Sequence, residues 1–221
     1  MPFNIYQSVF DKRSGEYLEK KGARYQEHLL QLFVESPEGE TLRKEGIDAN
    51  WTAMMIEMGI SYVGVTPPQM SAEDLREILF ELIPRKISAP AEEAPDIIRE
   101  FQLFWQFLQR EFHLENAAAC LKVLNGRAVV RRLREGMSNP ANFGIAKSFV
   151  MEGMERGFDI TTQEGIQEWM EVYNAERGAA TKSPIPSSSL QSADLRQSPT
   201  RGKSRRKMEM INRRKRRQED K

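Results

Sequence analysis

The residues with the clearest chemical potential are basic and lie close together near the end of the chain. Ten lysines and arginines fall between positions 201 and 217, and Glu209 is the only acid among them. Arginine offers a charged fork that matches a phosphate group and lysine offers a point charge, so this segment predicts phosphate contacts. The candidate nucleic-acid-binding residues are Arg201, Lys203, Arg205, Arg206, Lys207, Arg213, Arg214, Lys215, Arg216 and Arg217.

The overall charge of +1 hides two oppositely charged parts of the chain. Residues 182–221 hold 13 Lys and Arg against 4 Asp and Glu, a net charge of +9, whereas residues 1–181 hold 20 against 28, a net charge of −8. A basic run of this kind binds polyanions or an acidic protein surface. We therefore expect the partner to be nucleic acid, or an acidic surface on another protein or on the chain's own body.

The composition of the basic segment favours non-specific binding. No aromatic residue lies between positions 201 and 217, so bases have no side chain on which to stack. Met208, Met210 and Ile211 provide too little apolar surface for a helix that lies on a membrane. The alternatives are an adaptor module whose tail docks on acidic protein, and a tail that only increases solubility.

Elsewhere the sequence favours a non-enzymatic protein without cofactors. His28 and His113 have no second histidine at a metal-binding spacing, and Cys120, the only cysteine, is interpreted as a small buried residue. Carboxylates such as Glu100 and Glu111 are interpreted as solvated helix faces, and no pair is suited to acid and base catalysis. A hydrolase with an unrecognised carboxylate site stays open as a further alternative.

The elements that must position these residues are helices. Apolar residues recur at helical spacing, and no alternating strand pattern flanks a hairpin signal, so we predict an all-α fold with about seven or eight helices. We place an acidic helical domain at 14–177, a disordered Ser/Pro linker at 178–200 and the basic tail at 201–221. The expected helices span 16–35, 48–64, 75–83, 96–112, 114–124, 127–135, 139–157 and 161–177. Ser36-Pro37 should end the first helix, Ser71 should cap the third and Pro84 should end it, and Asn139 and Thr161 should cap the last two.

Two of these helices carry further expectations. The apolar arc of 96–112 is too wide for a surface helix, so this segment, with Trp105, should form the centre of the core. Arg127, Arg131 and Arg134 follow one another at helical spacing after the Asn125-Gly126 turn. The pattern faintly suggests a helix-turn-helix, but we favour an exposed face with salt bridges.

The remaining features favour a cytoplasmic protein. A single cysteine excludes an internal disulfide, the N-terminus lacks the apolar core of a secretion signal, and no window is apolar enough to span a membrane.

Part of the chain resembles a helical module of uncharacterised bacterial proteins. The resemblance covers about half of the chain and is carried by Tyr62-Val-Gly-Val-Thr-Pro67, Leu75 to Ile87, Phe101 to Phe107 and Asn142-Phe-Gly-Ile-Ala-Lys147. Some proteins of that kind end in a cysteine-rich zinc motif, which Cys120 alone cannot supply. The resemblance implies a bacterial cytoplasm and no particular activity.

Overall fold

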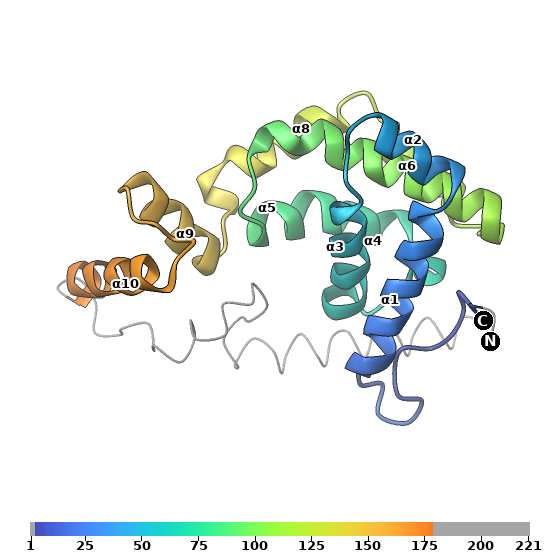
Figure 1. The fold of residues 1–221 in the computed structure, drawn as a ribbon, viewed down its shortest axis with the longest axis horizontal. Helices are drawn as coiled ribbons and strands as arrows, with labels where there is room; N and C mark the ends of the chain where they lie inside the picture. The colour runs from blue at the N-terminus through green and yellow to red at the C-terminus, as the bar shows by residue number, and fades with distance from the viewer. Residues whose placement is uncertain (1–2, 179–221) are drawn as a thin grey trace.

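The computed structural model describes residues 3–178, and this part of the chain is all-α, as predicted (Figure 1). No β-strand occurs among the described residues, which contain only an isolated bridge between Phe10 and Tyr17. The helices are α1 (Glu19–Val34), α2 (Pro37–Lys44), α3 (Asn50–Met58), α4 (Ala72–Glu77), α5 (Ile83–Lys86), α6 (Ala94–Phe112), α7 (Ala117–Leu124), α8 (Val129–Ser138), α9 (Ile145–Glu155) and α10 (Gln163–Gly178).

Helix α6 is the centre of the main core, which confirms the prediction from its wide apolar arc. Phe101, Phe104, Trp105 and Leu108 are fully buried, and α2, α3, α7 and α8 all pack against this helix. The Phe104 ring meets the ring of Phe33 from α1 edge to face, with centroids 5.2 Å apart. The Trp105 indole Nε1 is buried without a hydrogen-bond partner among the described residues, so Trp105 contributes through packing alone.

The segment before α1 also belongs to this core, although the predicted helical domain began only at residue 14. Ile5, Val9 and Phe10 are buried. The Tyr25 hydroxyl donates to the Ile5 carbonyl at 3.0 Å from inside α1. These apolar residues do not recur at helical spacing, so the sequence pattern did not predict that they would be buried.

Helix α2 was not predicted, because Ser36-Pro37 was interpreted only as the end of the preceding helix. The Ser36 hydroxyl accepts a hydrogen bond from the Gly39 N–H at 3.1 Å and so caps the start of α2. Pro37 occupies the first helical position, where its missing N–H removes no helical bond.

Pro84 does not end the third predicted helix, contrary to expectation. A π-helical turn, Ile78–Leu82, joins α4 to α5, and the Ile83 N–H donates to the Ile78 carbonyl five residues earlier. A proline inside an α-helix clashes with the carbonyl four residues before it, and the wider π-turn immediately before Pro84 accommodates the ring. The predicted cap of this helix at Ser71 is confirmed by its hydrogen bond from the Asp74 N–H.

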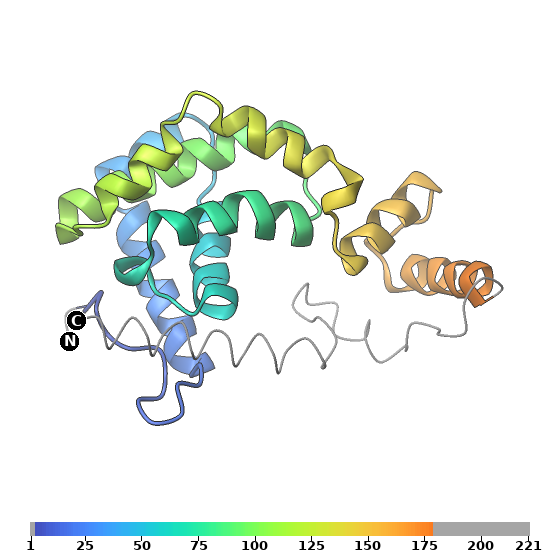
Figure 2. The ribbon, with the colours of Figure 1, turned by 180° about the vertical axis from the view of Figure 1, so that it is seen from behind.

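Helices α9 and α10 form a pair that extends from one end of the main body (Figures 1 and 2). Their buried residues make a second, separate cluster rather than an extension of the first. Its members are Phe149, Trp169, Met170 and Tyr173.

The helix starts in this pair differ from the predicted ones. Asn139 caps only a short 3₁₀ turn, Pro140–Asn142, and α9 begins later, at Ile145. Thr162, not Thr161, accepts the capping hydrogen bond of α10, from the Gly165 N–H at 3.1 Å.

Candidate nucleic-acid interface

All ten predicted phosphate-binding residues lie outside the described residues 3–178, as do the predicted basic tail and, apart from Gly178 at the end of α10, the predicted linker. The structure therefore describes most of the acidic part of the chain, and the last helix that it describes is α10. The described residues show which surfaces of this acidic part a polyanion or a basic segment would meet.

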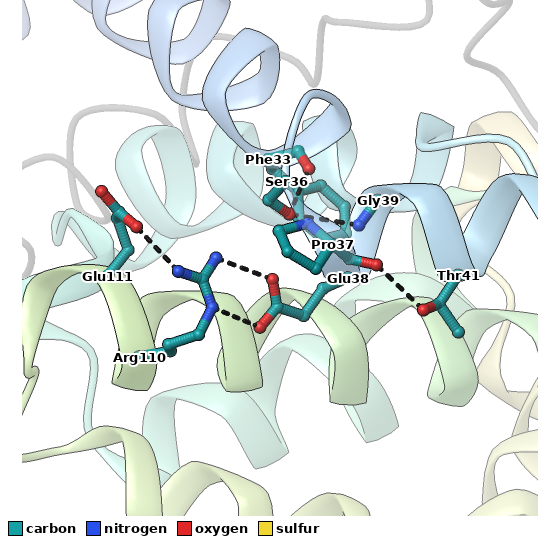
Figure 3. A network of polar contacts seen from close by, with 8 residues as sticks. All are labelled: Phe33, Ser36, Pro37, Glu38, Gly39, Thr41, Arg110 and Glu111. Atoms are coloured by element: carbon teal, nitrogen blue, oxygen red, sulfur yellow. Dashed lines mark hydrogen bonds and ion pairs between the residues drawn. The ribbon is translucent and has the colours of Figure 1, made fainter.

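The arginines whose side chains reach from one helix to another in the body are mostly held in ion pairs with carboxylates. Arg110 of α6 makes a two-pronged contact with Glu38 of α2, at 2.8 and 2.9 Å, and a third bond to Glu111 at 2.9 Å (Figure 3). The Arg110 guanidinium holds the pKa of the Glu38 carboxyl below its ordinary value. Arg99 binds Glu45 in the same manner. Arg99 and Arg110 therefore hold α2 and the residue that follows it against α6, and their charges are already paired with carboxylates.

The arginine that joins α9 to α10 is also paired with carboxylates. Arg156 donates to both carboxylate oxygens of Glu176 at 2.8 Å and to Glu152 at 3.0 Å. Its guanidinium also lies 5.1 Å from the centroid of the Trp169 ring.

Helix α8 is the exception, because its arginines face outward with little compensation. Val129, Leu133 and Met137 are buried against the body. Arg127, Arg131 and Arg134 are exposed, and we call this set the α8 arginine face. The prediction of an exposed basic face is correct, although Arg127 lies in the turn before the helix rather than inside it.

The ion pairing expected on this face is sparse. Arg131 and Glu135 are 3.8 Å apart and both largely exposed, a geometry of little energetic value. Within residues 3–178, neither Arg127 nor Arg134 takes part in an ion pair. Arg132, their neighbour, instead stacks over the Phe80 ring at 4.0 Å, which ties α8 to the π-turn beneath it.

The exposed side of α10 carries the opposite charge. Glu164, Glu168 and Glu171 follow at helical spacing and, with Gln163 and Gln167, line a shallow open depression. Gln167 donates to Glu171 at 3.1 Å. The acidic row therefore lies on the last described helix, which precedes the predicted linker and basic tail along the chain.

Glu100 is a carboxylate whose predicted environment is wrong. It was interpreted as part of a solvated face, but its side chain is completely buried. One carboxylate oxygen accepts from the Trp51 N–H at 3.2 Å and the other from the Thr52 N–H, so Glu100 of α6 caps the start of α3. Burial raises the pKa of this carboxyl to about 7, opposing the hydrogen bonds from Thr52 and Trp51, which lower it. No sequence signal links positions nearly fifty residues apart.

Lys147 is the corresponding buried cation, at the junction of the main body with α9. Its ammonium group donates to the Pro84 carbonyl at 3.0 Å and to the Met137 carbonyl at 3.4 Å, and it lies 4.0 Å from the centroid of the Phe143 ring. Burial lowers the pKa of the Lys147 amine to about 8. The residue joins the ends of α5 and α8 to α9.

The remaining reactive side chains do not converge. His28 is exposed beside Phe3, and His113 ends α6 with a positive φ of 52°. Cys120 is buried, and burial raises the pKa of its thiol to about 12. Among the described residues, no group of three or more His, Cys, Asp and Glu side chains is placed to hold a metal ion.

None of the described helices is long and apolar enough to cross a membrane. No protein-family model matches the sequence, and neither the curated proteins nor the solved structures contain a match.

Proposed function

We propose that this is a non-enzymatic helical protein whose basic C-terminal tail binds nucleic acid, DNA or RNA, non-specifically through phosphate contacts. The observation that carries the proposal is the opposition of charge along the chain, −8 over residues 1–181 and +9 over residues 182–221. A body of net negative charge repels the phosphate backbone, so the attraction must come mainly from the tail.

The surface of the body supports this assignment. Its cations at Arg99, Arg110 and Arg156 are already neutralised by carboxylates, whereas Glu164, Glu168 and Glu171 on α10 are exposed. The arginines that join the helices of the body are therefore already paired, and the exposed cations that remain, on the α8 arginine face and on α1, are set in a body of net negative charge. In the tail, ten lysines and arginines lie between positions 201 and 217, and Glu209 is the only acid among them.

The test is binding to a short DNA duplex as a function of salt. If most of the ten basic residues engage phosphates, log K should fall against log salt with a slope of about −6 to −9, because each contact releases a counterion. The affinity should change little when the duplex sequence is scrambled.

Cutting the chain after Gly178 should remove measurable binding at about 0.15 M salt, and circular dichroism should confirm that the body keeps its helices. A matched control replaces Lys20, Lys21 and Arg24 of α1 by glutamine, which removes three exposed cations and leaves the tail intact. Full affinity in the truncated chain would refute the assignment to the tail.

The second candidate is an adaptor whose tail docks on its own acidic body or on an acidic partner. The observation in its favour is the exposed acidic row on α10, the helix that precedes the predicted linker and basic tail along the chain. Raising salt to about 0.5 M would screen such docking, so the molecule should expand in solution scattering. Absence of duplex binding by the full chain at low salt, together with that expansion, would favour the adaptor.

A further inference from the structure

We propose that the α8 arginine face is a second phosphate-contacting surface, which binds the same nucleic acid as the tail and fixes how the body lies on it. The inference rests on the proposed function and names where on the body the nucleic acid would be held.

The first argument is local charge. Residues 127–134 contain four arginines and no acid, within a part of the chain whose net charge is −8. Elsewhere in the described residues the arginines of the interhelical contacts meet carboxylates at hydrogen-bond distance, as Arg99 and Arg110 do. Within residues 3–178, the ion pairing of the α8 arginines is limited to the loose, exposed approach of Arg131 to Glu135. The cations that face solvent here are therefore available to an external anion.

The second argument is rigidity. Helix α8 is fixed on its inner side by the buried residues Val129, Leu133 and Met137. The turn before it is fixed by Gln102 of α6, whose side-chain amide donates to the Leu124 carbonyl at 3.2 Å and to Asn125 Oδ1 at 3.0 Å. A fixed helix holds its arginines in place before binding, which reduces the entropy lost when they contact phosphates.

The third argument is geometry. At 1.5 Å per residue, Arg131 and Arg134 are offset by about 4.5 Å along the axis, and Arg127 lies in the turn that precedes the helix. The face thus forms a short row rather than a point, which suits a backbone that carries successive charges. Figure 2 shows α8 (yellow) along the upper, outer edge of the main body, with its C-terminal end leading toward α9.

The length of the chain allows the tail and α8 to act on one duplex. Twenty-two residues separate Gly178 from Arg201, and a fully extended chain of that length reaches up to about 75 Å. Two linked sites on one ligand bind more tightly than either alone, provided both can engage it.

The experiment compares two triple variants of the full-length chain. Arg127→Gln, Arg131→Gln and Arg134→Gln remove the face, whereas Lys20→Gln, Lys21→Gln and Arg24→Gln remove three exposed cations from α1 and lower the net charge equally. Glutamine keeps good helix propensity, and circular dichroism checks that both variants fold. The probe is a duplex of about 20 base pairs, titrated from about 0.05 to 0.3 M salt.

The α8 variant should lose about two to three units of salt slope, because three phosphate contacts disappear. Its affinity at about 0.15 M salt should fall on the order of 100-fold, since each contact contributes roughly 5-fold there. The α1 variant should keep the wild-type slope. As a second readout, bound duplex should protect Arg127, Arg131 and Arg134 from an arginine-modifying reagent but leave Arg13 reactive.

Equal slopes and equal affinities in the two variants, with wild-type binding intact, would overturn the inference and leave the proposed function standing. No binding by the wild-type chain would overturn both. Loss of binding to polyglutamate in the α8 variant, with its duplex slope unchanged, would assign the face to an acidic protein and also overturn the inference.

Discussion

The main body and the α9–α10 pair are built from similar amphipathic helices but have cores of very different size. The body surrounds α6 with buried side chains from every neighbouring helix, whereas the pair buries Phe149, Trp169, Met170 and Tyr173 around one indole. Buried apolar area sets most of the stability of a folded unit. We therefore expect slow amide exchange in α6 and faster exchange, through local opening, in α9 and α10.

The largest effect should follow from removing the central indole of the body. Trp105→Ala should lower the free energy of unfolding by about 3 to 5 kcal/mol, because it leaves a large cavity in a fully packed site. Chemical denaturation followed by circular dichroism measures the change. A loss below about 1 kcal/mol would mean that the body does not depend on α6 as its centre.

The matched substitution in the pair should act locally. Trp169 stacks near Phe149, Phe158 and Tyr173, and its indole N–H donates to the Phe149 carbonyl at 2.8 Å. Trp169→Ala should destabilise the pair by about 3 kcal/mol or more and further accelerate amide exchange in 145–178. The main unfolding transition should shift by less than about 0.5 kcal/mol. An equal shift of both regions would show that the two cores unfold as one unit.

Glu100 makes the stability of the body depend on pH. Its pKa is raised from an ordinary value of 4.5 to about 7, so the folded state binds the proton more tightly than the unfolded state does. The stabilisation from this group is therefore full below pH 4.5 and is lost as pH rises through about 7, by at most about 3 kcal/mol.

The control for this effect is Glu100→Gln, which cannot titrate. The difference in unfolding free energy between wild type and variant should change between pH 4.5 and 7 in favour of the variant, while other groups cancel. A difference that stays constant over this range would show that Glu100 is ionised throughout.

The smallest effect should come from the junction between the two regions. Lys147→Met would leave the Pro84 and Met137 carbonyls without their shared hydrogen-bond donor. This change should weaken the packing of α9 against the main body by about 1 to 3 kcal/mol. Exchange in α9 should accelerate while α6 stays protected. Exposed Lys122→Met serves as the control. Unchanged exchange in α9 would mean that the pair is held by other contacts.

The sequence predicted what depends on local patterns and failed where distant residues meet. The apolar arc of 96–112 and the cap at Ser71 were enough to place α6 and α4. Glu100 could not be assigned, because the N–H groups that it caps become its neighbours only after folding. Pro84 was misjudged for a similar reason, since a π-turn is a response of the folded helix and leaves no sequence signal.

The candidate site divides in the same way. Charge counts predicted the basic tail and the exposed arginines near Arg131, because net charge is a property of composition. They could not show that the arginines of α6 would be neutralised while those of α8 would not, which depends on which helices lie side by side.

The positions of the tryptophans give each region its own optical label. Trp105 lies in the dry interior of the body with an unpartnered indole N–H, Trp169 lies at the centre of the pair, and Trp51 is only partly covered at the start of α3. An indole in apolar surroundings fluoresces at shorter wavelength than one in water, and its emission moves to the red when its own surroundings open. Replacing two of the three tryptophans by phenylalanine would leave a single emitter, so the opening of either core could be followed alone.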